Sequence, residues 1–246
     1  VSTESIAAMT KRSLPADRDR FASWRPNIPQ FARCSGVVLG EDAQTLHPDE
    51  EALLHPRAGL ARRRSFSLGR SAAHDALASL GRDTGPILAG DVREPVWPAG
   101  VMGSISHTTD VGIALVALAS RTDGVGVDEE QRRHAPELEN RIPRPEERTW
   151  LEDRPQSERA DDLLALFSAK ESIFKAFFPT VRSYFGFEAA LLEPTQSGYV
   201  GRLVEPVSAE YPADRPFDIG CEWLGSTVVT WVVLRKSETE TIGRRG

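Results

Sequence analysis

The sequence predicts an α+β fold, because helical and extended patterns occur together in both halves of the chain. With 246 residues, 40% of them hydrophobic, the chain can bury a substantial core, either as one large domain or as two packed lobes. We place the boundary between an N-terminal lobe, 1–120, and a C-terminal lobe, 121–246. The last residues, about 237–246, are polar and are expected to form a disordered tail.

The first half contains one strong helix signal followed by two strand signals. Within 56–81, alanine and leucine side chains recur at helical spacing and Gly81 supplies a stop. The apolar runs 111–120 and 124–128 are typical of buried strands, with a turn between them. The Gly- and Pro-rich stretch 85–103 is expected to be a partly extended loop.

The second half shows the same mixture in a different order. Helical character begins near Pro145, and the clearest helix is 161–178, which Pro179 is expected to stop. Three strand-like runs of an antiparallel sheet follow, at 198–205, 216–223 and 226–234.

Composition limits the classes of function. The formal charge of −6 argues against nucleic-acid binding, which normally requires a basic face. Cys34 and Cys221 are far apart, so neither a disulfide framework nor a zinc cluster is indicated, and a reducing cytoplasm fits best. The sequence shows no signal peptide and no run of about 18 apolar residues that could span a membrane.

The stretch GVGVDEE, residues 124–130, places three carboxylates directly behind a predicted strand. Side chains alternate along a strand, so Asp128 and Glu130 share one face while Glu129 points to the other. Two adjacent carboxylates repel each other unless a cation or a proton lies between them, and oxygen ligands favour Mg²⁺ or Mn²⁺. The motif is therefore either a metal site or a solvated acidic turn, and a third carboxylate would favour the metal site.

Glu171, on the predicted helix 161–178, can provide that third carboxylate. Glu171 and Lys175 lie four residues apart on one helical stripe, with Lys170 on the adjacent stripe. As an ordinary helix ion pair they would contribute about 0.2–0.5 kcal/mol. The neighbouring phenylalanines instead indicate a mostly buried helix, in which charged groups need a partner or a ligand.

Ser106 and His107 come just before the strand predicted at 111–120. Loop residues in such a position often reach a site at the edge of a sheet. Neighbouring residues on an extended chain point apart, so the pair by itself is no catalytic dyad. A turn in which both side chains cap backbone groups is the alternative.

The order of four motifs resembles the Sfp-type 4′-phosphopantetheinyl transferases, particularly their EntD-like branch. The motifs are RRRSFSLGR, REPVWPAGVMGSISH, GVGVDEE and FSAKESIFK, which together span about 58–175. The resemblance implies a pseudo-dimer of two similar α/β lobes with the active site in the cleft between them. It also implies coenzyme A as substrate, Mg²⁺ as metal and an apo acyl or peptidyl carrier protein as partner.

The resemblance also implies roles for individual residues. Asp128 and Glu130 match the metal-binding DxE motif, and Glu171 matches the glutamate of the KE motif. Lys175 matches its downstream lysine, and His107 matches a histidine that contacts the coenzyme A phosphates. The full set expected to bind coenzyme A is Arg62, Arg70, Arg93, Ser106, His107, Lys170 and Lys175. Arg93 only lies near the position where some members carry a lysine, and Phe167 replaces the tryptophan with which the last motif often begins.

The implied reaction moves the 4′-phosphopantetheine arm to a carrier serine and releases 3′,5′-ADP. Glu171 and Lys175 are the expected catalytic residues, with Glu171 either the general base or only a ligand of the metal. Two alternatives remain: a Mg²⁺-dependent phosphohydrolase, which would need no carrier, and a non-catalytic module that binds carrier proteins. We expect a cytoplasmic monomer that binds neither nucleic acid nor membrane.

Overall fold

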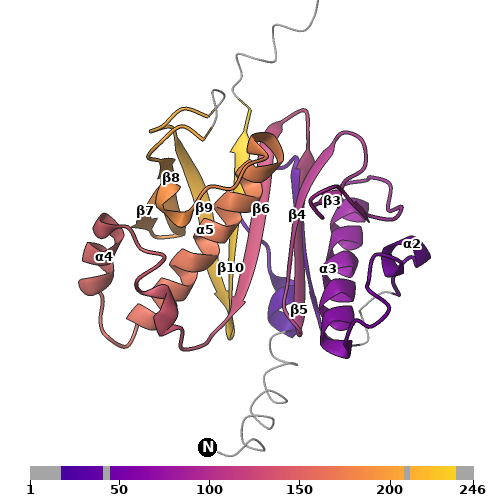
Figure 1. Ribbon diagram of the computed structural model, residues 1–246, viewed down its shortest axis with the longest axis horizontal. Helices are drawn as coiled ribbons and strands as arrows, with labels where there is room; N and C mark the ends of the chain where they lie inside the picture. Colours follow the sequence, from indigo (N-terminus) through magenta and orange to yellow (C-terminus); the bar gives the residue numbers. More distant parts are fainter. Residues whose placement is uncertain (1–17, 41–44, 208–210, 237–246) are drawn as a thin grey trace, which may run out of the picture.

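The computed structural model describes residues 18–40, 45–207 and 211–236. Each half of the chain builds a lobe in which one long helix packs on an antiparallel sheet, and the two sheets meet in the middle of the molecule (Figure 1). This arrangement confirms the predicted α+β fold. The predicted tail at 237–246 lies outside the described residues.

The N-terminal lobe is a three-stranded sheet covered by one helix. Its elements are β1 (Ala32–Val38), α2 (Pro48–Glu51), α3 (Leu60–Ser79), β2 (Leu88–Ala89), β3 (Pro95–Val96), β4 (Val101–His107) and β5 (Val111–Leu118). The strand order is β1-β5-β4, and α3 packs across all three strands. The predicted helix and β5 are confirmed. The loop expected before β5 instead contains the strand β4, which carries both Ser106 and His107.

The C-terminal lobe is a five-stranded sheet covered by α5. Its elements are β6 (Thr122–Gln131), η1 (Pro136–Leu138), α4 (Pro145–Glu152), α5 (Arg159–Val181), η2 (Phe187–Ala189), β7 (Ala190–Thr195), β8 (Gly198–Leu203), β9 (Pro216–Leu224) and β10 (Thr227–Arg235). The strand order is β6-β10-β9-β8-β7. The three strands predicted last correspond to β8, β9 and β10, whereas β1 and β7 had no predicted counterpart.

Helix α5 is longer than predicted. The expectation that Pro179 stops it is wrong, because α5 continues to Val181 and ends at Arg182, whose φ is 49°. A proline this close to the end of a helix removes one hydrogen bond of the last turn and leaves the rest of the helix intact. Neither α5 nor any other helix in the described ranges is long and apolar enough to cross a membrane.

The seam between the lobes is formed by β4 and β6, which lie beside each other but belong to separate sheets (Figure 1). The Val127 backbone N–H donates to Ser104 Oγ across the seam at 3.1 Å. Next to it, an apolar cluster that includes Ile113, Val125 and Trp231 joins side chains of both lobes. The lobes therefore share one continuous interior.

Glycines allow each long helix to lie directly against a strand. A Cβ atom on Gly124 would be 2.0 Å from the carbonyl oxygen of Ala176, and one on Gly126 would be 1.8 Å from that of Ser172. A Cβ atom on Gly112 of β5 would meet the backbone of α3 at 2.2 Å. No side chain fits between helix and strand at these points, so the distance from α5 to β6 is set by backbone contact.

We predict that Gly126→Ala destabilises the protein by about 1–3 kcal/mol or more, because the new methyl group must push α5 away from β6. Chemical denaturation would measure the free energy of unfolding. Gly85→Ala is the control, since a Cβ atom there meets only the Asp83 side chain at 3.7 Å. Equal stability of both variants would contradict a backbone contact at Gly126.

Candidate active site at the seam between the lobes

Asp128 lies at the centre of a polar cluster built from both lobes. The Lys175 ammonium on α5 donates to Asp128 Oδ1 at 2.7 Å, to Ser106 Oγ at 3.0 Å and to the Val127 carbonyl at 3.1 Å. Ser106, on β4, donates in turn to Asp128 Oδ1 at 3.0 Å. Three elements, β4, β6 and α5, thus converge on one carboxylate, which is only 5% exposed.

The register of β6 separates the three acidic side chains as the alternation of a strand predicts. Asp128 pairs with Thr230, whose hydroxyl contacts α5, whereas Glu129 pairs with Val229 in the apolar cluster between the sheets. Glu130 returns to the face of Asp128, and its carboxylate lies 3.4 Å from Arg133. Glu129 is 2% exposed, and neither of its carboxylate oxygens has a hydrogen-bond partner in the described structure. Burial raises the pKa of Glu129 far above its usual range, with a further contribution from Asp128.

Glu171 lies one helical turn before Lys175 and is electrostatically coupled to the same cluster. Burial raises its pKa above the ordinary value, and the Asp128 carboxylate raises it further, while Lys175 acts in the opposite direction. The pKa of Glu130 is also raised, first by burial and then by Asp128. The free protein thus holds three carboxyl groups that repel one another.

The chemistry of these carboxylates suits a divalent cation. The second oxygen of Asp128, Oδ2, is buried and has no hydrogen-bond partner among the described residues, so it can accept a cation. A cation would also relieve the repulsion that raises the pKa of Glu130 and Glu171. Within the described ranges, however, no three His, Cys, Asp or Glu side chains are already close enough together to hold one. Lys175 holds Asp128 in this arrangement.

A second, cationic cluster lies on the other face of β4, against α3. An added Cβ on Gly69 would lie 3.0 Å from His107 Cδ2, so this glycine lets the imidazole lie directly against α3. Arg62 Nη1 lies 3.5 Å from His107 Nε2. The Arg70 guanidinium stacks 4.6 Å from the Phe66 ring centroid, and its Nε atom lies 3.7 Å from Glu50 Oε1 in a buried ion pair.

Burial and the positive charges of this cluster lower the pKa of His107. Burial lowers it first, and the charges of Arg62, Lys175 and Arg70 lower it further. The imidazole is therefore mostly neutral in the free protein near pH 7. A phosphate group placed here would favour its charged form, because it would offset the surrounding cations.

Two predicted coenzyme A ligands lie apart from these clusters. Arg93, with φ 68°, occupies the turn between β2 and β3, and none of the contacts just described involves it. Lys170 is 2% exposed, and its ammonium donates to Glu147 and to three backbone carbonyls. This placement does not support direct contact between Lys170 and coenzyme A.

Sequence reasoning missed two features of the site. Ser104 joins the lobes through Val127, and its spacing from Ser106 in SIS, which puts both serines on one face of a strand, could have indicated this. A small cavity of about 90 Å³ also lies beside Glu171, lined by the aromatic side chains of Phe174, Tyr184 and Phe185. No local pattern predicts that cavity, because its walls come from α5 and from the loop that follows it.

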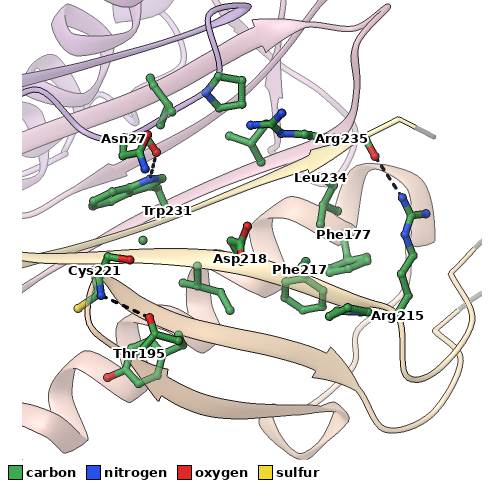
Figure 2. A pocket seen from close by; sticks show the side chains of 18 of the residues that line it. Asn27, Phe177, Thr195, Arg215, Phe217, Asp218, Cys221, Trp231, Leu234 and Arg235 are labelled. Atoms are coloured by element: carbon green, nitrogen blue, oxygen red, sulfur yellow. Dashed lines mark hydrogen bonds between the residues drawn. The ribbon is translucent and has the colours of Figure 1, made fainter. Parts of the chain in front are cut away.

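A larger cavity, of about 740 Å³, lies elsewhere (Figure 2). It is lined by residues of β8, β9 and β10 and by the segment 25–29, whose Asn27 carbonyl accepts from Trp231 Nε1 at 3.4 Å. None of the predicted site residues lines it. Its size therefore does not mark the site, and the convergence of charged groups at the seam is the better guide.

Two family models match the chain. Residues 49–117 match the family model described as the 4′-phosphopantetheinyl transferase N-terminal domain. Residues 124–213 match the 4′-phosphopantetheinyl transferase superfamily. The first match ends in β5 and the second begins in β6, so the boundary between them coincides with the boundary between the lobes.

Three curated relatives carry related names. The chain is 37% identical to 4′-phosphopantetheinyl transferase Npt of Nocardia iowensis over 58% of its length, which spans 64% of that protein. It is 36% identical to 4′-phosphopantetheinyl transferase PptT of Mycobacterium tuberculosis, over 72% of this chain and 79% of the relative. It is 33% identical to enterobactin synthase component D of Salmonella typhi, over 79% of this chain and 84% of the relative. The chain therefore belongs to the 4′-phosphopantetheinyl transferases, enzymes that transfer phosphopantetheine from coenzyme A to apo carrier proteins.

Proposed function

We propose that the chain carries out this transfer at the seam, moving the 4′-phosphopantetheine arm of coenzyme A to a carrier serine and releasing 3′,5′-ADP. The observation that carries the proposal is the arrangement of two clusters on opposite faces of β4. One contains the coupled groups Asp128, Glu171 and Lys175, and the other contains the Arg62 guanidinium and the His107 imidazole. A ligand with a diphosphate and a separate 3′-phosphate offers one anionic group for each cluster.

Asp128, Glu130 and Glu171 are the residues to which we assign Mg²⁺, or Mn²⁺ in its place. When bound, the cation would neutralise negative charge on the coenzyme A diphosphate during the transfer. The unpartnered Oδ2 of Asp128 supports this assignment. Lys175 already donates to Asp128, Ser106 and the Val127 carbonyl, which use all three of its N–H bonds, so a diphosphate oxygen would take the place of one of these acceptors.

The nucleophile is the hydroxyl of the carrier serine. Its oxygen attacks the phosphorus atom that bears the pantetheine arm, and the bond from that phosphorus to the bridging oxygen breaks. The leaving 3′,5′-ADP keeps the electron pair of that bond. Glu171 would accept the serine proton as the general base.

The rest of coenzyme A has complementary surfaces on both sides of the reacting groups. Arg62, Arg70 and His107 would bind the 3′-phosphate. The cavity beside Glu171, lined by Phe174 and Phe185, would take the uncharged pantetheine arm, since its walls are mostly apolar.

We also propose that the protein acts as a cytoplasmic monomer. One chain supplies both lobes, so the seam needs no second copy. Cys34 and Cys221 are both free, and burial raises the pKa of the Cys221 thiol to about 12, which keeps it unreactive.

The first test is loading of an apo carrier with coenzyme A and Mg²⁺, measured as the mass gain of one phosphopantetheine arm. We expect loading by the wild type, and coenzyme A should remain intact when the carrier is omitted. Cleavage of coenzyme A without a carrier would indicate a phosphohydrolase instead.

Asp128→Ala and Glu130→Ala should abolish loading, while Glu129→Gln, on the opposite face of β6, should retain it. Equal loss in all three folded variants would contradict the assignment.

The second test concerns Glu171. Glu171→Gln should lower kcat by about 100-fold or more, because it removes a positioned charge at the reacting groups. Glu152→Gln, an exposed position on α4, is the matched control and should be indistinguishable from the wild type. Carrier loading by Glu171→Gln at the rate of that control would remove Glu171 from the mechanism.

The third test uses the pH dependence of His107. In the free protein its lowered pKa contributes stability that is present above about pH 6.5 and is lost as the pH falls through the folded-state pKa. Bound phosphate should reverse that shift. Affinity for 3′,5′-ADP should therefore increase more in the wild type than in His107→Gln as the pH falls from about 7.5 to 6.

Coenzyme A should be preferred over dephospho-coenzyme A by about 10- to 100-fold in the wild type alone. A full preference in the variant would assign the 3′-phosphate to the arginines.

A further inference from the structure

Lys170 precedes Glu171 in the sequence but belongs to a separate buried network. Its ammonium donates to Glu147 Oε2 at 2.7 Å and to the carbonyl oxygens of Phe187 at 2.9 Å, Ile142 at 3.1 Å and Ala190 at 3.2 Å. Four acceptors exceed the three N–H bonds of an ammonium group, so its donor capacity is fully used.

Glu147 extends this network to the rest of the lobe. Its carboxylate also accepts from the backbone N–H of Arg144 at 2.7 Å and from that of Leu192 at 2.9 Å. The Lys170–Glu147 pair therefore ties together the start of α4, the middle of α5 and the start of β7. Both side chains are at most 1% exposed.

The segment that Lys170 holds is a wall of the cavity beside Glu171. The carbonyls of Phe187 and Ala190 belong to the connection between α5 and β7, and Phe185, Phe187 and Ala190 line the cavity. Helix α5 contributes Phe174 to the lining, and the centroid of the Phe174 ring lies 5.4 Å from that of the Phe185 ring. Lys170 itself also lines the cavity, while its ammonium donates into the buried network and fixes the position of the 185–190 wall relative to α5.

We propose that Lys170, with Glu147, is a positioning residue that holds the 185–190 wall at the distance from α5 that the pantetheine arm requires. This inference rests on the proposed function. Under this proposal Lys170 affects the binding of the pantetheine arm and does not contact the phosphates. It acts through its hydrogen bonds to the backbone of the 185–190 wall. Under the same proposal Glu147, remote from the reacting groups, has a part in substrate binding.

The test compares two ligands that differ only in the arm. Calorimetry would measure the Kd of coenzyme A and of adenosine 5′-diphosphate 3′-phosphate, which carries all three phosphates without the arm, for wild type, Lys170→Met and Glu147→Gln. Both variants should weaken coenzyme A binding by about 10-fold or more and change binding of adenosine 5′-diphosphate 3′-phosphate by less than about 2-fold. Lys175→Met, which removes a proposed phosphate contact, is the matched control and should weaken the binding of both ligands.

Three results would overturn the inference. They are equal weakening of both ligands by Lys170→Met, unchanged binding of both, or a normal coenzyme A affinity in Glu147→Gln. Failure of the wild type to bind either ligand would instead contradict the proposed function.

A single substitution leaves one buried charge without its partner and can prevent folding. The double variant Lys170→Met with Glu147→Leu removes both charges and keeps an apolar volume of similar size, so it preserves the test. It still lacks the hydrogen bonds to the carbonyls of Phe187 and Ala190. We therefore expect weaker binding of coenzyme A and nearly unchanged binding of the ligand without the arm. Normal coenzyme A binding by this folded double variant would also overturn the inference.

Discussion

The direct contact between the backbones of α5 and β6 is the constraint on which the site depends. Gly124 and Gly126 carry no side chain, so the carbonyls of Ser172 and Ala176 lie against the strand. At this separation the Lys175 ammonium reaches Asp128 Oδ1 at 2.7 Å. Any side chain between helix and strand would lengthen that distance, because packed interiors have no spare volume. The spacing of Lys175 and Asp128 is therefore fixed by glycines that contribute no side chain to the cluster.

Buried charges divide into two kinds in this protein. Those outside the site are paired and hydrogen-bonded: Lys170 with Glu147, and Glu50 with His74 and the backbone N–H of Ile87. Within the seam, Asp128 Oδ2 and both carboxylate oxygens of Glu129 have no hydrogen-bond partner in the described ranges. Burying an unpaired polar atom costs free energy, and a bound cation would offset that cost at Asp128. Glu129 faces the apolar cluster, and its raised pKa favours the uncharged acid.

Strand geometry distributes the functional groups between the two clusters. Ser106 and His107 are neighbours in sequence, yet Ser106 contacts Asp128 on one side of β4 and His107 lies against α3 on the other. The same alternation on β6 separates Glu129 from Asp128 and Glu130. One strand can thus serve two separate anionic groups of a single ligand, at a separation set by the width of the strand.

The sequence by itself determined the periodic elements and the grouping of side chains along them. The long helices, the acidic strand and the separation of Glu129 from Asp128 followed from local spacing, because a repeat of 3.6 or 2 residues fixes which side chains share a face. The direction of Lys170 and the cavity beside Glu171 were decided by tertiary structure. The partners of Lys170 come from three distant segments, and the cavity has walls from α5 and from the connection to β7. Local sequence patterns predict neither the partners of Lys170 nor the cavity, because packing between elements determines which face of a buried helix contacts which partner.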